Sequence, residues 1–244
     1  MEAPAPRVTV SALRQMKRDG RRIVGVVAWD TPTAQLAERA GVDIVSVDDS
    51  VGVNLWGRAE DDPVSIDEML LVCAAVRRGA RRALVSCDVP AGVDDAVAAA
   101  LRLAREGGAD LVKLLADPAT VSAVARAGVP VFAEFHGGRD VPVEKLVDEA
   151  KRLEGAGASL LDFRHSGPVA GPAVARAVSI PVIGGLGGGP WLDGRVRLAH
   201  TAIGYAPKWL DAKSETYANT AKLALAAFAA LADDVRAGRQ IKGD

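Results

Sequence analysis

Charged and hydroxyl side chains follow three apolar runs of the sequence, at the point where each run ends. Asp48, Asp49 and Ser50 close the first run, Asp88 closes the second, and Lys113 closes the third. Continuous apolar runs are typical of buried parallel strands, and α/β enzymes carry their active sites at the C-terminal ends of such strands. Solvated loop residues would explain any one of these cases. Three successive runs that all end in such side chains predict one shared site instead.

Size and composition restrict the class of protein. The chain has 244 residues, 49% of them hydrophobic, which is enough for one domain with a full core. Its formal net charge is −1 and it has no basic block, so we expect no nucleic-acid partner and no membrane partner. Residues 1–6 lack the pattern of a secretory signal and are expected to be disordered, and we expect a cytoplasmic protein. Cys73 and Cys87 lie in apolar stretches without metal-ligand spacing, which favours buried thiols over a disulfide.

A unit of helix, glycine turn and buried strand repeats along the chain. Gly108, Gly128 and Gly157 each precede such a strand, and glycine supplies the left-handed residue that ends a helix. Eight strands alternating with helices, with no long linker, predict a closed barrel rather than an open sheet. We therefore expect a single-domain (β/α)8 TIM barrel over residues 1–244, with its eighth strand near residues 201–204.

Helix signals flank this repeat. Residues 8–20 form an amphipathic pattern that should cap the barrel, and residues 215–237 should form a long Ala-rich C-terminal helix. Thr31 offers a hydroxyl N-cap before a proline, and Ser65 with Glu68 forms a capping box. The loop before Ser65 is long enough for a functional lid.

A series of short motifs spreads over nearly the whole chain. They include Ala28-Trp29-Asp30, Asp49-Ser50-Val51-Gly52, Asp88-Val89-Pro90, Asp110-Leu111-Val112-Lys113-Leu114 and Asp193-Gly194-Arg195-Val196. Together they are specific, and with them the chain resembles the ketopantoate hydroxymethyltransferase (3-methyl-2-oxobutanoate hydroxymethyltransferase) family of phosphoenolpyruvate mutase/isocitrate lyase-like barrels. The resemblance also implies a homo-oligomer.

The resemblance implies a specific chemistry. Family members form the enolate of an α-keto acid and add it to the one-carbon unit of methylenetetrahydrofolate. They use Mg²⁺ or another divalent cation, which stabilises the negative charge of the enolate. By resemblance, Asp49 and Asp88 would bind the metal, and Ser50 and Lys113 would hold the carboxylate of the substrate.

The chain departs from the family at several site positions. The family's glutamate after the fourth strand is Leu115 here, and the glycine before its metal-binding aspartate is Asp48. The family's general-base glutamate aligns with Arg164, and its histidine on the fifth strand aligns with Glu134. The anchor for metal and keto acid is thus retained, whereas the groups that transfer the proton are not.

The fifth strand offers replacements for the missing base. Side chains alternate along a strand, so Glu134 and His136 share one face, while Asp162 lies one layer deeper than Arg164. We expect Glu134, then His136, to serve as the base, with Asp162 as a partner of Lys113 or Arg164. The alternative for Glu134 is a structural ion pair with Arg164.

Arg164 suits a different task from the glutamate it replaces. A guanidinium stays charged at any working pH and grips a carboxylate with two parallel donors. This departure favours a substrate with an additional anionic group.

Three functions follow from these residues. The leading hypothesis is a metal-dependent hydroxymethyltransferase or aldolase-type enzyme that acts on a small-molecule α-keto acid other than the usual one. A lyase or mutase of the same superfamily would reach the same enolate by breaking a carbon–carbon or carbon–phosphorus bond. A non-catalytic metabolite-binding barrel would keep the pocket without the base.

Overall fold

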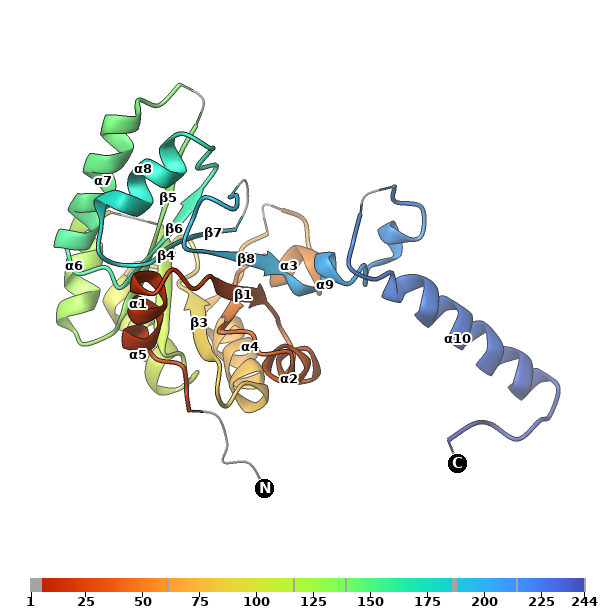
Figure 1. Ribbon diagram of the computed structural model, residues 1–244. Helices are drawn as coiled ribbons and strands as arrows, with labels where there is room; N and C mark the ends of the chain where they lie inside the picture. The colour runs from red at the N-terminus through yellow and green to blue at the C-terminus, as the bar shows by residue number, and fades with distance from the viewer. Residues whose placement is uncertain are drawn as a thin grey trace. The chain divides into compact units, whose positions relative to one another are not determined.

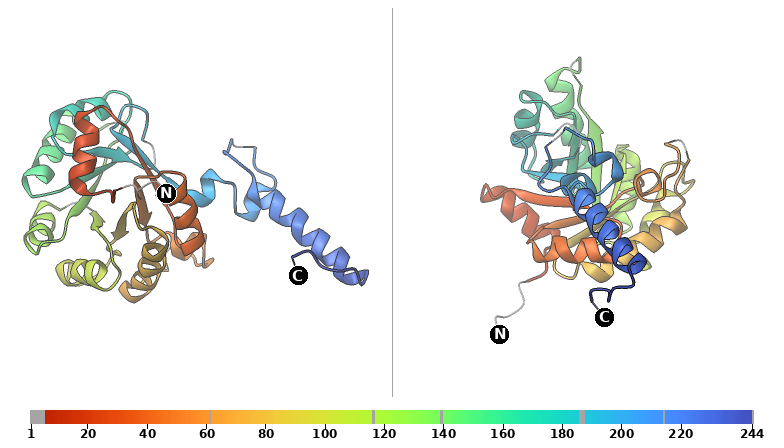
Figure 2. Two further views of the ribbon diagram at one scale, coloured as in Figure 1. Left: turned by 60° about the horizontal axis from the view of Figure 1, so that its bottom comes forward. Right: turned by 90° about the vertical axis from the view of Figure 1, so that its right-hand side faces the viewer.

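The computed structural model of the protein describes residues 6–60, 62–115, 117–138, 140–185, 188–213 and 215–243. Its strands form a closed barrel in chain order, and helices lie around the outside of the barrel (Figures 1 and 2). This arrangement confirms the predicted (β/α)8 TIM barrel. The strands are β1 (Ile23–Val27), β2 (Ile44–Val47), β3 (Leu84–Asp88), β4 (Leu111–Leu115), β5 (Val131–His136), β6 (Leu160–Arg164), β7 (Val182–Gly184) and β8 (Gly194–Leu198).

Except for α1, which precedes β1, the helices of the barrel lie between consecutive strands. Most of them bury small and branched apolar side chains, such as Ala99 and Leu103 of one helix, against the strands. They are α1 (Val10–Arg18), α2 (Thr31–Arg39), α3 (Val51–Asn54), α4 (Ile66–Gly79), α5 (Ala96–Arg105), α6 (Pro118–Arg126), α7 (Val143–Gly155) and α8 (Ala170–Ala177).

Helix α1 caps the N-terminal end of the barrel, as its pattern predicts. The amide of Val8 donates to the carbonyl of Arg82, just before β3. The ammonium of Lys17 donates to the carbonyl of Ile180 before β7 and forms a 2.9 Å ion pair with Asp193 before β8. Because α1 contacts the residues that precede the strands, it lies away from their C-terminal ends.

Two helix starts differ in how well the sequence predicted them. The capping box of α4 is confirmed, since Ser65 accepts from the Glu68 amide and Glu68 accepts from the Ser65 amide. Helix α2, in contrast, is capped by Asp30 and not by Thr31. The Asp30 carboxylate accepts from the Thr33 amide over 2.7 Å, because a carboxylate one residue earlier reaches the exposed amides of the first turn.

The eighth strand was predicted in the wrong place. It is β8, whereas residues 201–204 follow it in and beyond a short helix. Exposed Arg195 and Arg197 alternate with buried Val196, so β8 lacks the continuous apolar run of the other strands. At its start, a Cβ on Gly194 would lie 2.2 Å from the carbonyl oxygen of Ile23 in β1, so only glycine allows this close approach where the barrel closes.

The loop before α4 begins as a helix. Residues 51–54 form α3, and Val51 and Gly52 are buried. Farther along, Arg58 pairs with Glu68 of α4. The function of this loop as a lid stays a prediction.

The chain divides into two compact units, one up to Arg197 and one from Leu198 onward. The second unit contains α9 (Ala199–Ala202), a 3-10 helix (Pro207–Trp209) and α10 (Thr220–Arg236), the predicted Ala-rich helix. A compact unit within one chain need not fold alone, and the single domain expected over residues 1–244 stays a prediction. The expected disorder of residues 1–6 falls, except for Pro6, outside the described residues. Among the helices that the structure describes, none is long and apolar enough to cross a membrane.

Candidate active site

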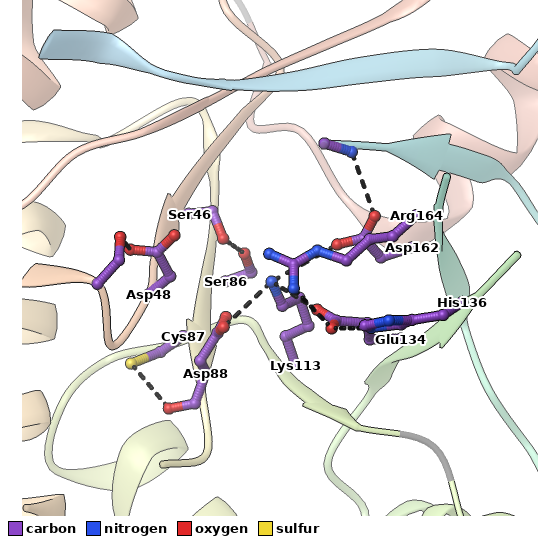
Figure 3. Close-up of polar contacts among 12 residues, drawn as sticks. Ser46, Asp48, Ser86, Cys87, Asp88, Lys113, Glu134, His136, Asp162 and Arg164 are labelled. Carbon is purple, nitrogen blue, oxygen red and sulfur yellow. Dashed lines mark hydrogen bonds and ion pairs between the residues drawn. The ribbon is translucent and has the colours of Figure 1, made fainter. Parts of the chain in front are cut away.

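Polar side chains from neighbouring strands meet at the C-terminal end of the barrel (Figure 3). They come from β2 through β6, which are consecutive in both the chain and the barrel. The members of this cluster, called the charged cluster below, are Asp48, Asp88, Lys113, Glu134, His136, Asp162 and Arg164.

Strand register brings these residues together. Parallel neighbours place residues of equal depth side by side, and alternation then sends every second side chain to the same face. This confirms that Asp162 lies one layer deeper than Arg164. In the register, Asp88 pairs with Lys113, Glu134 pairs with Asp162, and His136 pairs with Arg164.

Lys113 is the centre of the charged cluster. Its Nζ lies 3.1 Å from Asp88, 3.2 Å from Glu134 and 3.5 Å from Asp162. Burial alone would lower the pKa of Lys113, but the charges of Asp88, Asp162 and Glu134 raise it above its ordinary value. Lys113 therefore stays charged, and the predicted role of Asp162 as its partner is confirmed.

Both oxygens of Glu134 are occupied. Oε1 accepts from Nη1 of Arg164 over 2.9 Å and lies 2.8 Å from Nε2 of His136, while Oε2 faces Lys113. Burial alone would raise the pKa of Glu134, but Lys113, His136 and Arg164 lower it below its ordinary value. Glu134 is therefore ionised and held by three partners, which suits it poorly to accept a proton and well to orient His136.

The end of β2 turns Asp48 inward and Asp49 outward. Asp48 is 8% exposed and accepts hydrogen bonds from Nε1 of Trp29 at 3.1 Å and from the Ser50 hydroxyl at 2.7 Å. Asp49 is exposed, and its side chain forms no hydrogen bond or ion pair with any described residue. The structure thus brings Ser50, Lys113, Glu134, His136, Arg164 and Asp88 to one end of the barrel, but it leaves the side chain of Asp49 in solvent.

Alternation along β2 places Asp48 inward once the structure shows which face of the strand is buried. The Ser46 hydroxyl meets the Ser86 hydroxyl at 2.7 Å in the buried interior, so the residue two positions later also faces inward. Motif comparison had singled out Asp49, because the family has a glycine at the position of Asp48. The charge of Asp49 nevertheless acts on the site, since it contributes to raising the pKa of Asp88.

The surroundings of Asp88 show whether this site suits a divalent cation. Its Oδ2 faces Lys113, while its Oδ1 is buried and has no hydrogen-bond partner among the described residues. Burial raises the pKa values of Asp48, Asp88 and Asp162 against the opposing charge of Lys113, so their ionised forms are disfavoured, and a bound cation would stabilise them. Carboxylate oxygens are the ligands that Mg²⁺ prefers. The residues present therefore fit a divalent cation at Asp88, although no three His, Cys, Asp or Glu side chains within the described ranges are arranged to hold one.

Solved structures share this fold at low sequence identity. A 2,3-dimethylmalate lyase of the PEP mutase/isocitrate lyase superfamily superposes with a TM-score of 0.64 at 13% identity, over 98% of this chain and 93% of that chain. A phosphonopyruvate hydrolase complexed with oxalate and Mg²⁺ superposes with a TM-score of 0.63 at 17% identity, over 96% and 89% of the two chains.

Sequence comparison is more specific. A 3-methyl-2-oxobutanoate hydroxymethyltransferase from Moorella thermoacetica is 35% identical over 97% of this chain and 96% of its own. One from Geobacillus kaustophilus is 36% identical over 91% of this chain and 87% of its own. The sequence model of ketopantoate hydroxymethyltransferase matches residues 7–240. The chain therefore belongs to the ketopantoate hydroxymethyltransferase family of transferase enzymes.

Proposed function

We propose that this protein catalyses a metal-dependent, aldol-type reaction that forms a carbon–carbon bond at C3 of an α-keto acid through its enolate. The observation that carries the proposal is the pair formed by Lys113 and Asp88, in which one buried oxygen of Asp88 has no hydrogen-bond partner among the described residues. The resemblance suggests methylenetetrahydrofolate as the donor of the one-carbon unit. Arg164 stands where the family has its general-base glutamate, and this change favours a keto acid other than 3-methyl-2-oxobutanoate.

Asp88 would hold the cation through Oδ1, and Asp48 and Asp49, whose charges act on Asp88, would assist it. When bound, Mg²⁺ supplies a Lewis acid that stabilises negative charge as it develops on the keto oxygen. Leu115, which is 72% exposed at the end of β4, offers no ligand where the family has a glutamate.

Lys113 and Ser50 would bind the carboxylate of the keto acid. Lys113 is charged and held by its acidic neighbours, so its ammonium would already be in position before substrate binds. Ser50 donates to Asp48 at 2.7 Å and can rotate its hydroxyl to a substrate oxygen at little cost.

His136 would remove the proton from C3, with Glu134 as its positioning residue. Nε2 faces Glu134, and 48% of the His136 side chain is exposed, so the opposite ring nitrogen can reach substrate. A base of this kind contributes typically about 10²- to 10⁴-fold to the rate.

Exchange of deuterium into C3 of the keto acid tests the proposal. In D₂O, the wild-type protein should exchange the C3 protons of at least one acid in a panel of α-keto acids, and exchange should require Mg²⁺. Asp88→Asn should abolish exchange and weaken Mg²⁺ binding in calorimetry, because it removes the charge that holds the cation. Asp117→Asn, at an exposed cap of α6, is the matched control and should leave both unchanged. No exchange with any acid would refute the proposal.

A carbon–carbon or carbon–phosphorus lyase or mutase is the second candidate. It is favoured by Arg164, which replaces a carboxylate with a group that binds anions. Product analysis with a dicarboxylic hydroxy acid separates the two, since a lyase would release two fragments without a one-carbon donor. If the protein is a non-catalytic barrel, it should bind ligand and metal, and neither Glu134→Gln nor His136→Ala should change any measurable rate.

We also propose a cytoplasmic homo-oligomer. The support for self-association is the set of large apolar side chains that α10 exposes, including Leu223 at 70% and Phe228 at 69%.

A further inference from the structure

Arg164 ends β6 beside the charged cluster, and its guanidinium points toward Lys113 (Figure 3). Nη1 donates to Oε1 of Glu134 over 2.9 Å, and 32% of the side chain is exposed. The other oxygen of Glu134 lies 3.2 Å from Nζ of Lys113. One carboxylate therefore spans the gap between the two positively charged groups and holds the guanidinium through Nη1 alone.

The opposite edge of that guanidinium has no hydrogen-bond partner within the described ranges. Nε of Arg164 is buried, and it has no hydrogen-bond partner among the described residues. Nη2 likewise donates to no side chain or carbonyl in the described part of the chain. Nε and Nη2 carry parallel N–H groups whose spacing matches the two oxygens of a carboxylate. A buried donor without an acceptor is unfavourable, so this edge is arranged for an acceptor that a ligand brings.

A purely structural role does not account for this edge. Glu134 is already held by Lys113 and His136, and its ion pair with Arg164 uses Nη1 alone. An ion pair with Glu134 needs only one donor of the guanidinium, so it does not explain why the Nε–H group is buried without an acceptor.

We infer that the Nε–Nη2 edge of Arg164 binds a second carboxylate of the substrate, so that the substrate is a short dicarboxylic α-keto acid. This inference rests on the proposed function, which places the first carboxylate at Lys113 and Ser50. A single carboxylate of Glu134 bridges Lys113 and Arg164, so the two cationic groups lie close enough for a short dicarboxylate to reach both.

A matched pair of ligands tests the inference. The acids 2-oxopentanedioate and 2-oxopentanoate share a five-carbon chain and differ only at the terminal carboxylate. In calorimetry with Mg²⁺, the wild-type protein should bind the dicarboxylate roughly 10- to 100-fold more tightly, as expected for a charge-assisted bidentate contact. Arg164→Gln should bring this ratio close to one. Arg164→Lys keeps the charge but loses the fork and should give an intermediate ratio.

Arg126→Gln, at the exposed end of α6, is the control and should leave the ratio unchanged. If Arg164→Gln does not fold, Arg164→Lys still carries the comparison, because its ammonium can pair with Glu134. Equal affinities in the wild type, or a ratio that neither Arg164 variant lowers, would overturn the inference. Tighter binding of 3-phosphonopyruvate than of the dicarboxylate by the same margin would also overturn it, in favour of a phosphonate.

Deuterium exchange on the same acids separates this inference from the proposed function. Mg²⁺-dependent exchange with equal affinity for both acids would leave the proposed reaction intact and remove the second carboxylate. Selective binding of the dicarboxylate without exchange of any acid would support the inference and refute the proposed reaction.

Discussion

His136 holds one ring nitrogen against a carboxylate and leaves the other free. Nε2 lies 2.8 Å from Oε1 of Glu134, and Nδ1 makes no hydrogen bond to a residue that the structure describes. A carboxylate in this position fixes the orientation of an imidazole and supports positive charge on it, which is the arrangement of a base with its orienting group. The carboxylate of Glu134 also forms ion pairs with Lys113 and Arg164, so these two cations already balance its negative charge.

We expect His136→Gln to slow Mg²⁺-dependent exchange at C3 by roughly 10²- to 10⁴-fold, because the group that accepts the proton is lost. Glu134→Gln should cause a smaller loss, since the imidazole remains but is less firmly oriented. Exchange is followed by proton NMR. Asp117→Asn, at the exposed start of α6, is the control and should leave exchange unchanged. An equal loss in this control would contradict the specific role of His136.

At the scale of elements, the start of α4 joins the loop after α3 to the barrel. Glu68 closes the capping box with Ser65 and also pairs with Arg58 of the loop. The hydrogen bond from Arg58, followed by those from Ser65, lowers the pKa of Glu68 from 4.5 to about 2. The ionised carboxylate thus ties the loop to the helix.

The sign of the pH dependence follows from this lowered pKa. A carboxyl group whose pKa is lower in the folded state than in the unfolded state stabilises the fold at pH values above the unfolded pKa. This stabilisation disappears as the pH falls through the folded pKa. Glu68→Gln should therefore lower the urea midpoint of unfolding near neutral pH, and the difference from wild type should shrink below about pH 4. Glu60→Gln, in the same loop, should show no such trend. A difference that stays constant with pH would contradict the assignment.

At the scale of the whole molecule, α10 is the element whose apolar side chains lack cover within its own unit. Leu225 is 57% exposed and Phe228 is 69% exposed, while Ala221 is its buried residue. Exposed apolar patches of this kind mark interfaces between proteins. The family resemblance makes a second copy of the chain the expected partner.

We expect light scattering after size exclusion to show an oligomer, and Phe228→Glu to shift it toward the monomer, because a charge would be buried in the interface. Lys222→Glu lies on the same helix and changes charge without removing an apolar side chain, so it should leave the assembly intact. A wild-type monomer at all concentrations would refute the proposed association.

The sequence by itself determined the order of the elements and most of the strand ends that carry charge. Apolar runs, helix-ending glycines and the Ser65 capping box are local patterns, and local propensity together with the alternation of helix and strand is enough to predict a barrel. The buried state of Cys73 and Cys87 also followed from their apolar surroundings and is confirmed. The position of β8 did not follow, because its exposed arginines interrupt the apolar pattern.

Only the tertiary structure decided which charged groups face one another. Asp48 rather than Asp49 turns inward, and Glu134 gives both oxygens to Lys113, His136 and Arg164. These contacts depend on the register between consecutive strands that whole helices separate in the sequence. A one-residue change of register would send each side chain to the opposite face, and no local pattern specifies that register.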